Sequence, residues 1–260
     1  MRIYGGLALA AAIASSAIIA APAAARADGM PEPAVEHHHH SSYNWSGVYV
    51  GANAGWFNAD IDGTYVLPPP DKHSVSQSDG IYGLHLGAQH QFGHLVVGIE
   101  GAYSVTPSDS WGTSNSIGPS CLQATPVANR TCSDRMRNLA TIGGRLGWAP
   151  NNQWLLFASG GYATANLQSQ TSVTSTGVVT DTANTRADGW YIGGGVEFAL
   201  TRNWILGVEY QHVDLGDGIL FKTAPGPLNI NDRTASADAD IVRARISFKL
   251  GREAEMAPLK

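Results

Sequence analysis

The feature of this sequence that most limits its fold is a repeated alternation of apolar and other residues with a period of two. In the first such run, Val48, Val50 and Ala52 fall on one side, whereas Gly51 and Asn53 fall on the other. Strands place successive side chains on opposite faces, so this period predicts β-structure. Eight such runs begin near residues 48, 82, 95, 140, 154, 190, 204 and 242. The run from 154 is apolar on both faces, so the sequence does not indicate which of its faces lines the interior.

The length of the runs separates a membrane barrel from a soluble sandwich. Each run extends over about 10–13 residues, close to the length that a tilted strand needs to cross a bilayer. Strands of soluble sandwiches are usually about 5–6 residues long. The sequence therefore predicts an all-β fold, an antiparallel up-and-down transmembrane β-barrel of eight strands that covers residues 45–250.

The connections between the runs alternate between short and long. The short ones lie at 93–94, 149–153 and 201–203, and the long polar ones at 61–79, 106–137, 168–188 and 216–237. Outer-membrane barrels have short periplasmic turns and longer external loops, so we expect the four long connections outside the cell. An even number of strands then places both chain ends in the periplasm.

Aromatic residues gather at the two ends of the runs and are absent from the middle. Such belts of Trp and Tyr mark the two membrane interfaces of a barrel. The predicted aromatic girdle consists of Phe92, Trp148, Trp154 and Trp204 beside the short turns and of Trp56, Tyr82, Tyr103, Trp190 and Tyr210 toward the long connections.

The two ends of the chain differ from the barrel in composition. Residues 1–27 have the pattern of a signal peptide, with Arg2 before an apolar stretch and cleavage expected after Ala27, or alternatively after Ala25. Residues 28–44 form a predicted periplasmic linker, and residues 251–260 a polar tail. The sequence contains two cysteines, Cys121 and Cys132. An even count in an exported chain predicts a disulfide, with zinc as a weaker alternative.

Composition excludes one class of function. The net charge of −5 and the absence of a basic run argue against nucleic acid as a partner. The mean hydropathy of −0.10 is compatible with a barrel, because only alternate residues of a membrane strand face lipid.

Charged residues recur on the faces predicted to line the lumen. A barrel of about eight strands has room only for side chains, so charges inside it must pair. We therefore predict a salt-bridge network that plugs the lumen, and a narrow charge-lined pore is the alternative. The predicted lumenal charges are Glu100, Arg145, Glu197, Glu209, Arg243, Arg245 and Lys249.

Other reactive residues carry weaker signals. The tract His37, His38, His39 and His40 has side chains that bind metals or haem iron, but a flexible polar segment is the favoured interpretation, so no metal or cofactor is predicted. His212 and Asp214 lie near the end of one run, and no nucleophile motif such as G-x-S-x-G accompanies them. We expect a protein that is not an enzyme.

Three segments carry a resemblance to a known family. Residues 43–51 (YNWSGVYVG), 145–150 (RLGWAP) with 157–163 (FASGGYA), and 203–216 (NWILGVEYQHVDLG) resemble the opening strand, central hairpin and penultimate strand of the outer-membrane immunogenic proteins, which belong to the opacity-type porin group. The resemblance implies an eight-stranded barrel in a bacterial outer membrane. Some members are similar to haem-binding surface proteins and others to small porins. Such barrels commonly end on an aromatic residue, whereas here Phe248 and Leu250 precede the polar tail, which leaves the assembly signal internal or weakened.

Taken together, these features predict a surface protein of the bacterial outer membrane. We expect outer-membrane lipid and the barrel-assembly machinery as partners, and host or surface ligands at the loops 61–79, 106–137, 168–188 and 216–237. A small porin and a haem-binding surface protein are the alternative functions.

Overall fold

The computed structural model describes residues 43–250, except 66–71, 108–110, 115–129, 152, 174, 223–226 and 228–231. The predicted signal peptide, most of the linker with His37–His40, Cys121 and the polar tail lie outside the described residues. No helix in the described part of the chain is long and apolar enough to cross a membrane.

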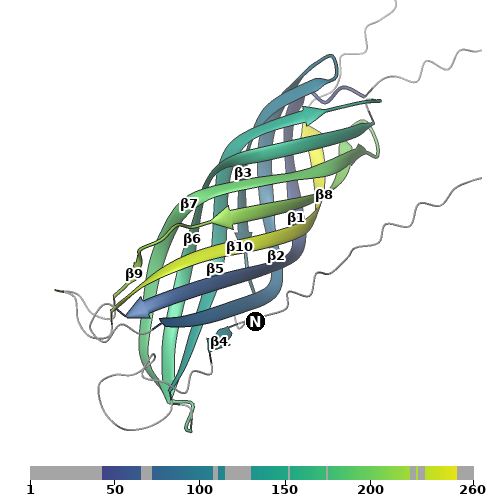
Figure 1. The fold of residues 1–260 in the computed structure, drawn as a ribbon. Helices are drawn as coiled ribbons and strands as arrows, with labels where there is room; N and C mark the ends of the chain where they lie inside the picture. The colour runs from purple at the N-terminus through teal and green to yellow at the C-terminus, as the bar shows by residue number, and fades with distance from the viewer. Residues whose placement is uncertain are drawn as a thin grey trace, which may run out of the picture. The chain divides into compact units, whose positions relative to one another are not determined.

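The described residues form one closed antiparallel sheet (Figure 1). Its strands are β1 (Gly47–Tyr65), β2 (Lys72–Phe92), β3 (Leu95–Val105), β4 (Gly112–Ser114), β5 (Arg130–Trp148), β6 (Trp154–Val173), β7 (Val179–Ala199), β8 (Trp204–Asp214), β9 (Ile219–Phe221) and β10 (Arg233–Leu250). Neighbours pair in the order β1-β2-β3-β5-β6-β7-β8-β10, and β10 pairs with β1 to close the ring.

The two short strands complete positions already in the ring. β4 pairs with β5 beyond the part of β5 that pairs with β3, and β9 pairs with β10 beyond the part that pairs with β8. The barrel therefore has eight strand positions, two of them interrupted. This confirms the predicted fold class.

Six strands are longer than predicted. β1, β2, β5, β6, β7 and β10 contain 18–21 residues. Much of the expected loops 61–79, 106–137, 168–188 and 216–237 is therefore strand, and the predicted strand length of about 10–13 residues was wrong for these six. Beyond the girdle the pattern reverses, since Asp60 and Asp62 face outward while Ile61 is buried inside.

The three short turns lie where the sequence predicted them. Gly93 and His94 join β2 to β3, with Gly93 at a φ of 64°. A two-residue hairpin turn favours such positive φ values, which glycine adopts without strain. At the turn between β7 and β8, Leu200 N donates to Trp204 O at 2.9 Å.

The outer wall of the barrel exposes the predicted girdle. Its nine aromatic residues have exposed fractions between 43% and 61%. Tyr162 of β6, which the sequence left unassigned, joins the outer belt with an exposed fraction of 45%. On β6 the even-numbered residues from Trp154 to Tyr162 face outward, so Leu155 and Phe157 are the inward ones.

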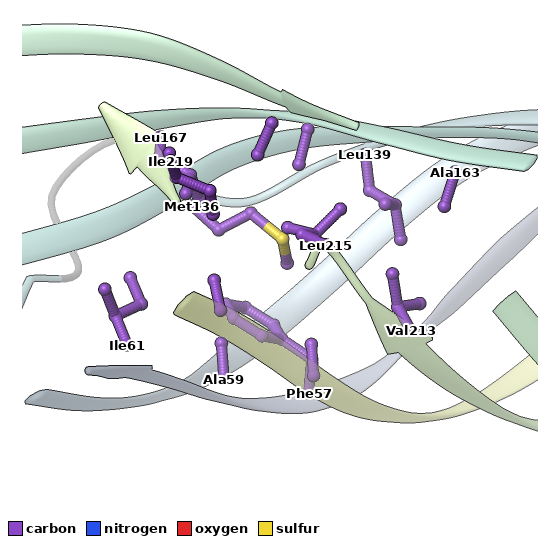
Figure 2. Close-up of a cluster of buried hydrophobic side chains, with 14 of the residues drawn as sticks. Phe57, Ala59, Ile61, Met136, Leu139, Ala163, Leu167, Val213, Leu215 and Ile219 are labelled. Atoms are coloured by element: carbon purple, nitrogen blue, oxygen red, sulfur yellow. The ribbon is translucent and has the colours of Figure 1, made fainter. Parts of the chain in front are cut away.

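The inward residues of β10 show how the lumen is layered. We call the end of the barrel with the short turns the turn end. Starting there, the inward residues are Ser247, Arg245 and Arg243, then Ile241, then the alanines at 239, 237 and 235, and finally Arg233. A polar and charged region therefore gives way to an apolar core. Figure 2 shows part of that core, with Met136 and Phe57 among side chains from several strands.

Candidate functional site

The candidate site is a set of six charges in the lumen, here called the charge layer, of which five are buried and Glu100 is 10% exposed. Five strands supply three carboxylates and three guanidinium groups, so the layer is balanced in charge. Its members are Glu100 of β3, Arg145 of β5, Glu197 of β7, Glu209 of β8, and Arg243 and Arg245 of β10.

Arg245 lies at the centre of this layer. Its Nη2 is 2.5 Å from Glu100 Oε2, its Nε is 3.2 Å from Glu197 Oε1, and its Nη1 is 2.8 Å from Glu209 Oε2. The Arg245 side chain is only 2% exposed. One guanidinium therefore links the carboxylates of three strands.

The other two arginines complete the pairing. Arg145 Nη2 lies 2.6 Å from Glu197 Oε2, and its Nη1 lies 3.5 Å from Glu100 Oε2. Arg243 Nε lies 2.9 Å from Glu209 Oε2. Each carboxylate in the layer thus contacts two arginines, as burial of charge requires.

Two aromatic residues that the sequence did not assign border the layer. Tyr49 of β1 donates its hydroxyl to Glu100 Oε2 at 2.7 Å and accepts from Arg145 Nη1 at 3.0 Å. The guanidinium carbon of Arg145 is 3.8 Å from the ring centroid of Phe157, a cation–π distance. Tyr49 has the same parity as the lumenal Asn53, and that parity is the signal that points to it.

A set of hydrogen-bonded polar side chains from β1, β2 and β10 lies beside the charge layer. His85 Nε2 and Ser247 Oγ are 2.8 Å apart, and His85 Nδ1 is 3.5 Å from Asn53 Nδ2. The His85 ring lies against Gly51, where an added Cβ would collide with it. Every strand position of the barrel therefore contributes a side chain at or beside the charge layer.

Lys249 lies apart from the other six predicted lumenal charges. Its Nζ donates to Asn44 O and is 4.4 Å from the Tyr43 ring centroid. This places Lys249 at the turn end of the barrel, beside the segment that precedes β1. The reason is its position, since it comes four residues after Arg245 along an extended strand.

Trp45 occupies the interior at that end. It is fully buried in a cluster with Val96, Leu155, Phe157 and Ile205. Its carbonyl accepts from Gln89 Nε2 at 2.9 Å. The sequence placed Trp45 at the start of the barrel but did not predict that it lies inside.

A second charged group lies at the opposite end of the lumen. Arg233 pairs with the buried Asp134 and donates to Ser169 Oγ. Its guanidinium carbon is 4.7 Å from the Phe221 ring centroid. Cys132 is fully buried nearby on β5. Its predicted partner Cys121 lies outside the described residues, so the disulfide stays a prediction.

His212 and Asp214, which lie near the end of β8, have different partners. His212 Nδ1 lies 2.9 Å from Asp240 Oδ1 on the outer wall, and Tyr210 also donates to that carboxylate at 2.6 Å. Asp214 instead accepts from Gly216 N at 2.7 Å. Within the described ranges, no group of three or more His, Cys, Asp and Glu residues could hold a metal ion.

Comparison with known proteins gives matches over most of the chain. The family described as outer membrane protein β-barrel domain matches residues 9–240. The 31 kDa outer-membrane immunogenic proteins of Brucella melitensis biotype 1 and Brucella suis biovar 1 are each 26% identical over 190 residues, which cover 67% of this chain and 73% of the relative.

Solved structures with similar folds include two outer-membrane proteins. Neisserial surface protein A is 13% identical, with 79% of this chain and 98% of that chain covered and a TM-score of 0.35. OprG from Pseudomonas aeruginosa is 9% identical, with 81% and 99% covered and a TM-score of 0.43.

Proposed function

Because the chain belongs to the outer membrane protein β-barrel domain family, we propose that it is a surface protein whose barrel serves as an anchor and does not conduct. The protein is located in the bacterial outer membrane. The proposed role has two parts, a closed lumen and an outer face that contacts ligands. The orientation proposed has the short turns in the periplasm and the long strand ends outside.

The charge layer is the observation that carries the proposal of a closed lumen. Three arginines and three glutamates, drawn from five strands, contact one another at 2.5–3.5 Å across the interior. An eight-stranded barrel is just wide enough for its own side chains. Opening a path through the layer would separate buried ions, which costs several kcal/mol for each ion left unpaired.

The outer ends of the long strands support the proposed contact role. β1, β2, β5, β6, β7 and β10 continue past the outer aromatic belt, and their outward faces there are polar. Binding residues commonly lie on connections that a rigid scaffold positions. We propose that host or surface ligands bind this end, with a Cys121–Cys132 disulfide bracing the connection between β4 and β5.

We also propose that the protein has no catalytic role. No carboxylate of the charge layer is without a cationic partner, and His212 is paired with Asp240. Among the described residues, no Ser, Thr or Cys side chain contacts His212 as a triad nucleophile would.

Liposome swelling tests the closed lumen against the small-porin alternative. We expect vesicles that contain the purified full chain to take up a small sugar no faster than protein-free vesicles. Vesicles with a general porin provide the positive control. Faster uptake through the wild-type protein would reject the proposal and support the porin.

The variant Trp45→Ala distinguishes which part of the interior closes the lumen. It opens the apolar cluster around Trp45 at the turn end but leaves the charge layer intact, so we expect its vesicles to stay as tight as the wild type. Uptake through this variant alone would assign closure to Trp45 instead of to the charge layer.

A further inference from the structure

A groove on the outer wall, across β5, β6 and β7, contains arginine and asparagine side chains. Its volume is about 450 Å³. We call it the arginine–asparagine groove. Its lining residues are Arg137, Asn138, Asn166, Leu167, Asn184, Thr185 and Arg186.

A β-bulge creates this groove. The register of β5 with β6 shifts between Met136 and Asn138, so Arg137 is the extra residue. A bulge changes the alternation of side chains along its strand. Met136 stays buried inside the barrel, whereas Arg137 is exposed on the outer wall next to Asn138.

The two arginines of the groove differ in their hydrogen-bond partners. The side chain of Arg137 makes no ion pair or hydrogen bond with any described residue. Arg186 donates its Nε to Thr164 Oγ1 at 2.9 Å and to Asp188 Oδ1 at 3.2 Å. The contact with Asp188 is an ion pair on the exposed wall, and both contacts use Nε and not a terminal nitrogen.

The asparagines add amide donors between the arginines. Cross-strand pairing aligns Asn138 with Asn166, and Asn166 with Arg186. Asn166 Nδ2 donates to Asn138 Oδ1 at 3.0 Å, so the amide nitrogen of Asn138 remains as a donor. The groove therefore combines the guanidinium of Arg137, the guanidinium of Arg186 with its Asp188 partner, and neutral N–H groups, a set of donors that suits a phosphate.

The level of the groove relative to the girdle suggests what fills it. Asn166 follows the girdle residue Tyr162 by four positions on β6, about 13 Å along the strand at the usual rise per residue. With the tilt of a barrel strand, this is about 10 Å along the membrane normal. Side chains at this height meet lipid headgroups, since aromatic belts lie at the membrane–water interface.

The wall on the other side of the barrel differs in charge from the groove. At a similar height on β1 and β10, the outer wall presents Asp60, Asp62, Asp238 and Asp240. The protein as a whole has a net charge of −5. A basic groove on one side of an acidic protein is therefore a local feature and not an effect of composition.

We propose that the arginine–asparagine groove binds the phosphate of a lipid headgroup in the outer leaflet. The inference rests on the orientation given under the proposed function, with the long strand ends outside. Arg137 and Arg186 bind the phosphate oxygens, and the Asn138 amide adds a hydrogen bond. The acyl chains of the same lipid extend along the wall toward Tyr162 and Trp190.

Native mass spectrometry of the full chain in detergent tests this site, with lipid A as the probe and its dephosphorylated form as the comparison. We expect lipid A to be retained more than the dephosphorylated form. The double variant R137Q/R186Q should retain it less, by about fivefold for each arginine removed. The matched control is Arg202→Gln, which removes an exposed arginine from the short turn between β7 and β8, and it should leave retention unchanged.

Four outcomes would overturn the proposal. The first two are equal retention by R137Q/R186Q and the wild type, and equal retention of both forms of the lipid. The third is displacement of lipid A by inorganic phosphate at equal concentration, which would indicate a site for free anions. A sulfated polysaccharide that binds through the two arginines while lipid A does not would also overturn it. Because mass spectrometry measures binding without regard to conductance, failure here is distinguishable from failure of the closed-lumen proposal.

Discussion

Arg245 is the residue on which the charge layer depends most. It contacts all three glutamates, whereas Arg243 contacts one and Arg145 two. Burial of so many ions is unfavourable unless each finds partners, because desolvation costs several kcal/mol per ion. The layer meets that condition through one central guanidinium, which makes the arrangement sensitive to a single substitution.

We expect Arg245→Gln to lower the free energy of unfolding by about 3 kcal/mol, because it leaves three carboxylates short of a buried partner. Arg243→Gln should cost less, about 1–2 kcal/mol, since Arg245 still contacts Glu209. Urea unfolding of the refolded barrel in vesicles, followed by tryptophan fluorescence, measures both. A larger loss for Arg243→Gln would contradict the central position of Arg245.

Two aspartates beyond the girdle, Asp238 of β10 and Asp188 of β7, should have opposite pH effects on stability. Burial, and then the opposing Asp60, raise the pKa of Asp238, whereas a hydrogen bond from Tyr162 lowers the pKa of Asp188. A raised carboxyl pKa means that the ionised form destabilises the fold. Asp238→Asn should therefore stabilise the barrel by about 0.5 kcal/mol at pH 7, and the gain should vanish below about pH 4.

Asp188→Asn is the matched comparison and should have the opposite sign. A lowered pKa means that the carboxylate contributes stability above the unfolded pKa and loses it as pH falls through the folded one. Urea unfolding as a function of pH measures both variants. The same sign for both at pH 7 would show that the local carboxylate environment does not control their effects.

At the scale of elements, the sequence predicts the strands well between the two aromatic girdles and poorly beyond the outer girdle. Between the two girdles, lipid-facing positions such as Leu84 and Leu86 are apolar while inward positions such as His85 are not, so parity is visible. Past the outer girdle the outward positions are polar and the inward positions are apolar. The sequence of this part of the strand therefore resembles that of a polar loop. The bulge at Arg137 changes the parity of β5, so that even-numbered residues up to Met136 face inward and odd-numbered residues from Leu139 do so.

The charge layer was predictable as a set of residues but not as a geometry. Parity identifies Glu100, Arg145 and Arg245 as inward, and it cannot say which pairs form, because pairing depends on strand stagger around the barrel. Lys249 has the same parity and lies at the turn end instead. The inward placement of Trp45 has no periodic signal, since this residue precedes β1.

The orientation of the hairpins can be checked with two cysteine variants. Ser175→Cys lies in the exposed turn between β6 and β7, and Arg202→Cys in the exposed turn between β7 and β8. We expect a membrane-impermeant maleimide to label the first on whole cells and the second only after lysis, with unmodified protein as the background. Labelling of Arg202→Cys on intact cells would reverse the proposed orientation.

The whole barrel has a lumen arranged in layers. Trp45 and its neighbours lie at the turn end, the charge layer follows, an apolar core fills the outer half, and Arg233 with Asp134 lies beyond it. Aromatic girdles surround the outside. This arrangement assigns contact with other molecules to the outer wall and the outer strand ends, and it assigns to the interior the role of holding eight strand positions together.

Single-channel recording in a planar bilayer measures most directly whether the barrel is closed. With the full chain inserted, and insertion verified by heat-modifiable migration of protein recovered from the same preparation, we predict no stepwise current at moderate voltages of either sign. Reproducible steps of uniform size from the wild-type protein would contradict a lumen closed by the charge layer.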